Sequence, residues 1–258
     1  MVTNCILNGT AAFAFLLATA SGVAQAQASD KSTPAAPVKQ KHAYYIDPQI
    51  LNLAASIPAP PDPGSPQFKA ELAEVHRIES ERTPAQVAAA QGDDREEDIF
   101  IYRGVVGDQF TAANFPILAE LSAHVHNDEP VEGNPIKDHF KRQRPYQFDK
   151  SLHPVCKTTD QPDSYPSGHT ITGYLLALTL IQMLPEKQSE ILTRADYYAH
   201  NRLVCGVHYE SDLKASQRVA YAEFGYLLAT PRFQRDLTRG GEELRTRLGL
   251  QPLSKEPE

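Results

Sequence analysis

Apolar side chains recur at spacings of three and four residues along much of this chain, which is the periodicity of an amphipathic helix. The pattern begins near residue 67, where Phe68, Leu72 and Val75 fall on one helical face. Alternating β-branched runs bounded by turns, which are typical of strands, are missing from the sequence. The stretch 169–184 is strongly apolar. The sequence therefore predicts an all-α, single-domain bundle packed around a buried central helix at 169–184.

Local signals predict where the other helices begin and end. Thr83-Pro84 has the pattern of an N-cap followed by proline at the first helical position. The acidic run 93–98 suits a helix N-terminus, so we expect a helix containing Ile99, Val105 and Phe110. Further helices are expected at 112–125, 186–205, 211–229 and 231–248.

The N-terminal region has the features of an export signal. Residues 11–20 read AAFAFLLATA, a run too short for the roughly 20 residues that span a bilayer. Small-x-small sites follow it, which predicts a signal peptide at 1–26 with cleavage after Ala26 or Ala28. Residues 1–10 contain no Lys or Arg, so the alternative is a hydrophobic N-terminal helix of the mature protein. The first interpretation predicts a periplasmic or secreted protein.

The rest of the chain divides into an arm and a domain. Residues 27–66 are polar and rich in proline, including the run PAPPDPGSP at 58–66, which cannot form a helix or a central strand. The helical domain is expected at 67–250. No segment after residue 30 is long and apolar enough to span a membrane. The sequence leaves open whether the protein forms homo-oligomers.

Composition excludes one broad class of partner. Hydrophobic residues make up 41% of the chain, enough for a sizeable core. The net charge of −7 argues against nucleic acid as a partner, since general nucleic-acid binding needs a basic footprint. A small anion can still bind in a local basic pocket.

The chain has three cysteines, and Cys5 would leave with the signal peptide. The remaining pair, Cys156 and Cys205, suits an oxidising compartment and predicts a disulfide. The alternative is two unrelated buried thiols.

Chemistry is concentrated in three separated segments, of which 163–170 (DSYPSGHT) is a loop that opens a helix. Free N–H groups at a helix start form an anion site, and Gly168 lets an oxyanion approach the backbone. The Ser167 hydroxyl adds a donor, and His169 at the mouth is placed to give a proton. The alternative is that Ser167 only caps the helix and His169 is solvated.

The segment 201–212 (NRLVCGVHYESD) contains a second histidine and a carboxylate. Gly206 is expected to end one helix in the left-handed conformation, and His208 to open the next. Asp212 lies four residues on, on the same helical face, where it can accept the N–H of one imidazole nitrogen. The other nitrogen then keeps a lone pair and can act as nucleophile or base. An ordinary surface pair is the alternative.

The segment 137–145 (KDHFKRQRP) is locally basic. Helical spacing places Lys137, Lys141 and Arg144 on one face and Arg142 elsewhere. Together with Arg202, these side chains can bind phosphate oxygens, arginine bidentately and lysine as a point charge. A solvated charged face is the alternative.

Taken together, the pattern Lys-x6-Arg-Pro, Pro-Ser-Gly-His and Arg-x5-His-x3-Asp resembles the signature of the type 2 phosphatidic acid phosphatase superfamily. That superfamily includes vanadium haloperoxidases, membrane lipid phosphatases and bacterial class A non-specific acid phosphatases. Residues 164–170 (SYPSGHT) look like the class A hallmark in particular. The three segments span 137–212, and the resemblance extends over the helical body from about residue 67 to residue 248.

The resemblance implies a role for each matching residue. His208 would attack phosphorus and form a phosphohistidine, Asp212 would orient it, and His169 would protonate the leaving group and later activate water. The phosphate oxygens would be bound by Lys137, Arg144, Ser167, Gly168 and Arg202. These cations replace a metal, so the resemblance implies no metal and no cofactor.

The implied activity is an acid phosphatase acting on small phosphomonoesters, with inorganic phosphate or vanadate as inhibitors. An alcohol in place of water would make the same intermediate a phosphotransferase. The alternatives are a vanadate-dependent haloperoxidase and a periplasmic phosphate-binding protein without turnover. A pure binder has no need of the His208–Asp212 pair beside a second histidine, which favours an enzyme.

The sequence departs from the family pattern at two positions. Asn201 stands where the family usually has Ser, and Asp163 where the class A hallmark usually has Gly. We expect the Asn201 amide to have modest effects. We expect Asp163 to face solvent, the alternative being a carboxylate at the pocket rim that disfavours very anionic substrates.

Overall fold

The computed structural model describes residues 42–47, 53–55 and 57–253, all within one compact unit. Its secondary structure is helical, and the described ranges contain no strand, which confirms the predicted all-α class. The predicted signal peptide at 1–26 and residues 27–41 of the arm lie outside the described residues. None of the helices described is both long enough and apolar enough to cross a bilayer.

The helices follow one another along the chain, and a long connection, residues 149–167, joins α5 to α6. In order they are η1 (Leu53–Ala55), α1 (Pro66–Glu81), α2 (Pro84–Asp93), η2 (Ile99–Tyr102), α3 (Arg103–Val106), α4 (Pro116–Phe140), α5 (Pro145–Phe148), α6 (Gly168–Met183), η3 (Pro185–Lys187), α7 (Gln188–Val204), α8 (Glu210–Ala229) and α9 (Pro231–Arg247).

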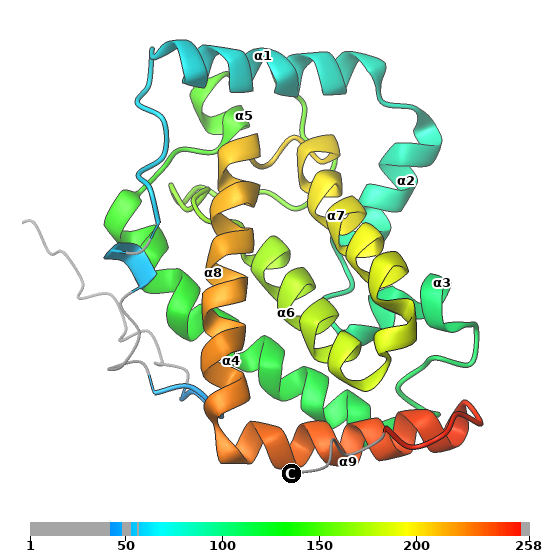
Figure 1. Cartoon of the computed structure of the whole chain (residues 1–258). Helices are drawn as coiled ribbons and strands as arrows, with labels where there is room; N and C mark the ends of the chain where they lie inside the picture. Colours follow the sequence, from blue (N-terminus) through cyan, green and yellow to red (C-terminus); the bar gives the residue numbers. More distant parts are fainter. Residues whose placement is uncertain (1–41, 48–52, 56, 254–258) are drawn as a thin grey trace, which may run out of the picture. The chain divides into compact units, whose positions relative to one another are not determined.

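Helix α6 is the centre of the bundle, as the apolar stretch predicted. Helices α4, α7, α8 and α9 contact it from different sides (Figure 1). Its leucines Leu175, Leu176 and Leu180 have no exposed surface. Gly173 allows α7 to approach closely, because a Cβ there would lie 2.7 Å from the ring of Tyr198. The central position of α6 fixes the place of its N-terminus, where the second polar segment lies.

Two helices differ from the sequence prediction. The helix expected at 112–125 begins at Pro116 and continues to Phe140, through Pro130 and Pro135. Proline normally breaks a helix, but the face of α4 that includes Val125 and Ile136 is buried in the core, and this packing outweighs the local preference. The helix expected after the acidic run is replaced by the short elements η2 and α3, and Phe110 lies in the following loop.

The described part of the arm packs against α4. Asp128 on α4 accepts backbone N–H groups from Tyr44, Tyr45 and Ile46 at 2.6, 2.6 and 3.1 Å. The Tyr44 ring stacks on His124 with a centroid separation of 3.4 Å. Tyr45 and Ile46 are buried, so the packed body includes residues upstream of the helical pattern.

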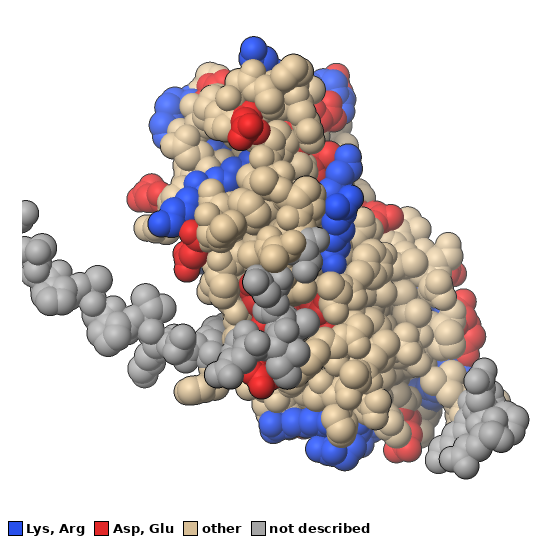
Figure 2. Space-filling view, turned by 60° about the vertical axis from the view of Figure 1, so that its left-hand side comes forward, with Lys and Arg blue, Asp and Glu red and all other residues tan. Residues whose placement is uncertain are grey.

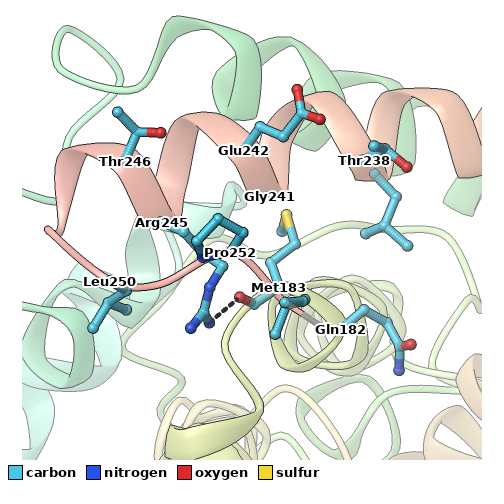
Figure 3. A pocket seen from close by; sticks show the side chains of 11 residues that line it. Gln182, Met183, Thr238, Gly241, Glu242, Arg245, Thr246, Leu250 and Pro252 are labelled. Carbon is cyan, nitrogen blue, oxygen red and sulfur yellow. Dashed lines mark hydrogen bonds between the residues drawn. The ribbon is translucent and has the colours of Figure 1, made fainter. Parts of the chain in front are cut away.

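A cavity of about 420 Å³ lies between the end of α6 and α9 (Figure 3). Met183 lines it, and Arg245 donates a hydrogen bond to the Met183 carbonyl at 3.2 Å and pairs with Glu186 at 2.6 Å. This cavity is at the opposite end of α6 from His169, so it does not adjoin the polar segments.

Charged side chains are mixed on the surface. On the face shown in Figure 2, lysine and arginine side chains lie in separate strips, interrupted by acidic and uncharged residues. General nucleic-acid binding needs a continuous basic track, which this face does not offer.

The interface between α4 and α8 contains buried carboxyl groups. Glu223 on α8 has no exposed surface, and within the described part of the chain neither of its carboxyl oxygens has a hydrogen-bond partner. Burial, and then the neighbouring Glu129, Glu132 and Asp128, raise the pKa of Glu223 well above its ordinary value. Burial and Asp128 raise the pKa of Glu132 to about 7.

These raised values predict that stability falls as pH rises. Both carboxyl groups bind protons more tightly in the folded protein than in the unfolded chain, where the pKa of glutamate is about 4.3. The stability that this proton binding contributes is fully present below that pH and is lost as the pH rises. For Glu132 the loss is complete near its folded pKa of about 7. We expect Glu223→Gln to lose less unfolding free energy than the wild type between about pH 5 and pH 8 in urea denaturation. The exposed Glu190→Gln is the matched control, and equal pH dependence in wild type and Glu223→Gln would contradict the assignment.

Candidate active site

The N-terminus of α6 is fixed to α8 by hydroxyl groups. Ser167 is the N-cap, and its Oγ accepts from the Thr170 N–H at 3.3 Å. Its own N–H donates to Ser216 Oγ at 2.8 Å, and the Ser216 hydroxyl lies 2.7 Å from the Asp212 carbonyl. Gly168 is the first residue of α6, so the start of the helix, with its free N–H groups, lies beside the first turn of α8.

Gly206 ends α7 as predicted, with a left-handed φ of 75°. The prediction that His208 opens the next helix is wrong, because α8 begins at Glu210 and His208 lies in the connection before it. Asp212 is in the first turn of α8, where its Oδ2 accepts from the Tyr209 N–H at 2.9 Å. The histidine and the aspartate therefore meet across a capping turn rather than along a helical face.

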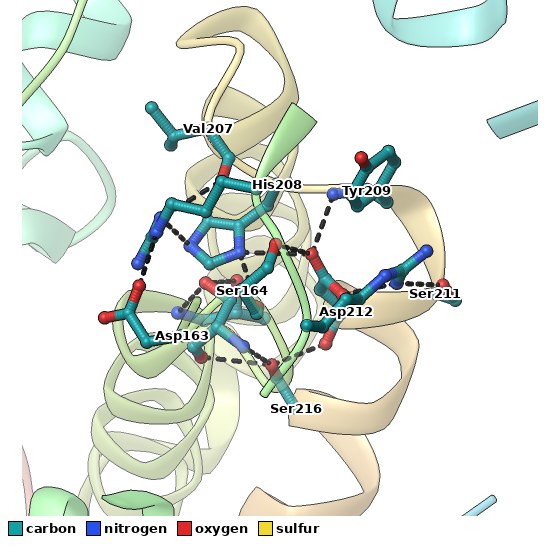
Figure 4. A network of polar contacts seen from close by, with 12 residues as sticks. Asp163, Ser164, Val207, His208, Tyr209, Ser211, Asp212 and Ser216 are labelled. Atoms are coloured by element: carbon teal, nitrogen blue, oxygen red, sulfur yellow. Dashed lines mark hydrogen bonds and ion pairs between the residues drawn. The ribbon is translucent and has the colours of Figure 1, made fainter. Parts of the chain in front are cut away.

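His208 is buried, with 1% of its surface exposed, and its hydrogen bonds define its tautomer (Figure 4). Nδ1 lies 2.8 Å from the Ser164 carbonyl and 3.2 Å from Asp212 Oδ2, and both oxygens are acceptors. Nδ1 therefore carries the proton, and Nε2 keeps its lone pair. Burial and the charge of Arg144 lower the pKa of His208 well below its ordinary value, so the lone pair persists into the acid range.

The basic segment is arranged differently from the prediction. Helix α4 ends at Phe140, and Lys141 adopts a left-handed φ of 47°, so Arg142 and Arg144 follow the helix instead of extending its face. The prediction that Lys137, Lys141 and Arg144 share one helical face is therefore wrong. Arg144 nevertheless reaches the site, where its Nη1 lies 3.0 Å from His208 Nε2.

The structure brings the three sequence segments together around His208. The charges of Arg144, Arg202 and Lys137 each lower the pKa of His208, which requires them to lie near its ring. Arg202 Nη1 donates to Asp94 Oδ1 at 2.6 Å, and its Nε is buried without a hydrogen-bond partner among the described residues.

His169 lies at the start of α6 with 20% of its side chain exposed. Its Nε2 is 3.3 Å from the Asp94 carbonyl oxygen and 3.5 Å from Glu97 Oε1. Burial and the charge of Arg202 lower the pKa of His169 to about 3. The His169 ring is therefore neutral above about pH 3 in this environment. Additional negative charge beside it would raise its pKa.

The two departures from the family pattern have different surroundings. Asp163 does not simply face solvent, because Arg144 Nε donates to its Oδ1 at 2.7 Å and the side chain is 30% exposed. The expectation of a solvent-facing carboxylate is therefore wrong. The Asn201 amide donates to Asp93 at 2.7 Å, and Asp93 also pairs with Arg194.

Sequence reasoning missed the side chains that support Asp212. Arg142 Nη1 donates to Asp212 Oδ1 at 2.5 Å, and its Nη2 donates to Glu71 Oε2 at 2.9 Å. Its guanidinium carbon also lies 4.1 Å from the centre of the Tyr209 ring. Arg142 belonged to the basic segment, but the sequence prediction placed it away from the other cations and gave it no role. Glu71 precedes Arg142 by 71 positions and has no sequence signal.

A disulfide joins Cys156 to Cys205, as predicted. It attaches the connection before α6 to the end of α7, and the Val155 N–H donates to the Cys205 carbonyl at 3.0 Å beside it. Among the described residues, one group of side chains has possible metal ligands close enough together to hold an ion, and it consists of Asp94 and these two cysteines. Because the sulfurs are bonded to each other, they are not available as thiolates.

Comparison with known proteins finds similarity to one family and to several bacterial phosphatases. The PAP2 superfamily matches residues 118–235. A non-specific acid phosphatase of Providencia stuartii is 29% identical over 215 residues, which cover 78% of this chain and 84% of that protein. A non-specific acid phosphatase of Salmonella typhimurium strain LT2 is 38% identical over 125 residues, which cover 46% of this chain and 48% of the relative.

A solved structure supports the fold. A bacterial vanadium-dependent iodoperoxidase superposes with a TM-score of 0.50 at 18% identity, covering 80% of this chain and 55% of that one. At this identity the likeness concerns the fold alone. The family match and the named relatives together support a bacterial class A acid phosphatase of the PAP2 superfamily.

Proposed function

We propose that this protein is an exported, metal-independent acid phosphatase that hydrolyses small phosphate monoesters through a phosphohistidine on His208. The observation that supports this most is the orientation of the His208 ring. Its Nδ1 proton is directed at Ser164 and Asp212, so the Nε2 lone pair faces the cationic groups. A nucleophile needs that arrangement, and a phosphate binder without turnover does not.

In the first step, His208 Nε2 attacks phosphorus as the bond to the ester oxygen breaks. His169 gives a proton to the departing oxygen, and the alcohol leaves. Lys137, Arg144 and Arg202 bind the other phosphate oxygens, where negative charge must be stabilised in the transition state. Asp212, 3.2 Å from Nδ1, balances the positive charge that develops on the His208 ring.

In the second step, water attacks the phosphohistidine, and His169, now neutral, accepts a proton from that water. The bond between phosphorus and Nε2 breaks, and inorganic phosphate leaves. An alcohol that replaces the water gives phosphotransfer by the same chemistry. The three cations and the N–H groups of α6 supply the positive charge that a metal supplies in other phosphatases.

The lowered pKa values support an acid working range. Burial and Arg144 lower the pKa of His208, so its lone pair is available well below the ordinary histidine value of about 6.5. His169 has a pKa of about 3 in the phosphate-free site, and the negative charge of bound substrate raises it. We therefore expect a bell-shaped pH profile with an acid-side maximum, and an alkaline limb in kcat that reports His169 in the substrate complex.

Hydrolysis of p-nitrophenyl phosphate tests the proposed function. We expect turnover between about pH 4 and pH 9 that peaks on the acid side, resists excess EDTA and is inhibited by vanadate. Loss of activity in EDTA would contradict metal independence. Tight phosphate binding without turnover would leave a binding protein, or a haloperoxidase that bromide and peroxide would reveal.

Export is tested separately. The apolar run at 11–20 and the small-residue sites after it support removal of a signal peptide. We expect protein recovered from the periplasm or the medium to begin at residue 27 or 29. Intact Met1 on protein retained in the cytoplasm would contradict export.

A further inference from the structure

Arg144 covers the lone pair that the mechanism needs. Its Nη1 lies 3.0 Å from both His208 Nε2 and the Val207 carbonyl. Its Nε donates to Asp163 Oδ1 at 2.7 Å, which holds the guanidinium in this position (Figure 4). A phosphate group can reach His208 only if Arg144 turns its N–H groups toward the phosphate oxygens.

Two carboxylates contact the phosphate-binding arginines, but they are bound differently. Asp94 accepts from Arg202 at 2.6 Å and from the Lys157 N–H at 3.0 Å, and its side chain is only 10% exposed. Asp163 has Arg144 as its ion-pair partner and is 30% exposed. Asp163 can therefore exchange Arg144 for water, whereas releasing Asp94 would leave a buried carboxylate without its partner.

We propose that Asp163 is a specificity-determining residue whose carboxylate competes with the substrate phosphate for Arg144 and disfavours leaving groups that carry further negative charge. The proposal rests on the proposed function and adds the class of substrate. The favoured substrates are monoesters of neutral or cationic alcohols, and the disfavoured ones are pyrophosphate and polyphosphate esters.

Charge at the entrance explains the selectivity. When Arg144 turns to the phosphate, Asp163 loses this partner and its carboxyl group stays at the rim. Glu97, whose side chain is 36% exposed, lies 3.5 Å from His169 Nε2, where the leaving group departs. A second phosphate in the leaving group would therefore meet two carboxylates, and like charges at short range repel. A neutral leaving group escapes this repulsion.

Asp163 stays charged in the pH range of the reaction. Burial acts to raise its pKa, but the hydrogen bond and charge of Arg144, with the charges of Lys137 and His208, together outweigh burial and lower the pKa below the ordinary aspartate value. Competition with phosphate therefore operates at acid pH as well as at neutral pH.

The test compares wild type with Asp163→Asn and Asp163→Gly. Affinity for inorganic phosphate is measured by calorimetry, and kcat/KM is measured with p-nitrophenyl phosphate and with pyrophosphate. We expect both variants to bind phosphate about fivefold more tightly, because Arg144 no longer has to leave an ion pair. We expect kcat/KM for pyrophosphate to rise by a larger factor than that for p-nitrophenyl phosphate. Asp160→Asn, an exposed aspartate in the same loop, is the matched charge control and should change neither quantity.

The outcomes separate this inference from the proposed function. If the Asp163 variants bind phosphate more weakly and lose kcat equally on both substrates, Asp163 positions Arg144 for catalysis and the competition is refuted. If Asp160→Asn has the same effect, the selectivity is a general charge effect and the inference fails. If no ester is hydrolysed but the Asp163 variants still bind phosphate more tightly than wild type, the competition between Asp163 and phosphate is supported. The proposed function is then refuted.

Discussion

His208→Ala is expected to lower kcat for p-nitrophenyl phosphate by at least about 10⁴-fold, the scale on which removal of a nucleophile acts. The ring directs its Nε2 lone pair at Arg144, because its Nδ1 proton is bound to Ser164 and Asp212. Steady-state rates and phosphate titration measure the effect. Phosphate binding should survive, because Arg202 and Lys137 remain.

His169→Ala separates the two steps. p-Nitrophenolate leaves without a proton, so the phosphoenzyme should still form, but no base remains to activate water and the intermediate should accumulate. His200→Ala, an exposed histidine on α7, is the control and should behave as wild type. Normal turnover by the His169 variant would show that the acid–base role is assigned to the wrong residue.

Arg142→Ala is expected to destabilise the protein by about 3–5 kcal/mol, the usual effect of removing one partner from a buried ion pair. The Arg142 side chain is 6% exposed and lies between Asp212, which is fully buried, and Glu71. Its loss leaves two buried carboxylates without their cation. Urea denaturation measures the loss, and activity should fall with it, because Asp212 orients His208.

A double variant tests whether stranded charge and lost bulk together account for the destabilisation. Adding Glu71→Gln to Arg142→Met removes one of the stranded charges and restores bulk, so it should recover part of the stability lost in Arg142→Ala. Arg77→Ala, which breaks exposed pairs with Glu74 and Glu81, should change the free energy of unfolding little. A change of similar size for Arg142→Ala would contradict the buried role of this arginine.

Local chemistry made much of the fold predictable. The Thr83 cap, the Ser167 cap and the left-handed Gly206 depend on residues within one turn, and each occurs in the structure. The apolar character of 169–184 was enough to place α6 at the centre. The extent of α4 was not predictable, because Pro130 and Pro135 oppose helix locally and only contacts with distant elements outweigh them.

The active site shows the same division between local and distant effects. The spacing of four residues predicted the contact between His208 and Asp212, which the structure contains. The contacts of His169 with Asp94 and Glu97 join residues that are far apart in sequence. The pairing of Asp163 with Arg144 depends on how two loops meet, so the sequence suggested the wrong surroundings. Glu71 reaches Arg142 from α1, and no spacing connects the two.

Locating the covalent phosphate during turnover tests whether His208 is the nucleophile. His169→Ala is mixed with p-nitrophenyl phosphate, quenched in alkaline denaturant, and digested for peptide mapping by mass spectrometry. The account predicts a covalent phosphate on His208 that is absent from His208→Ala. Phosphate on Ser167 or on another side chain, or turnover by wild type with no covalent phosphate at any time, would contradict it.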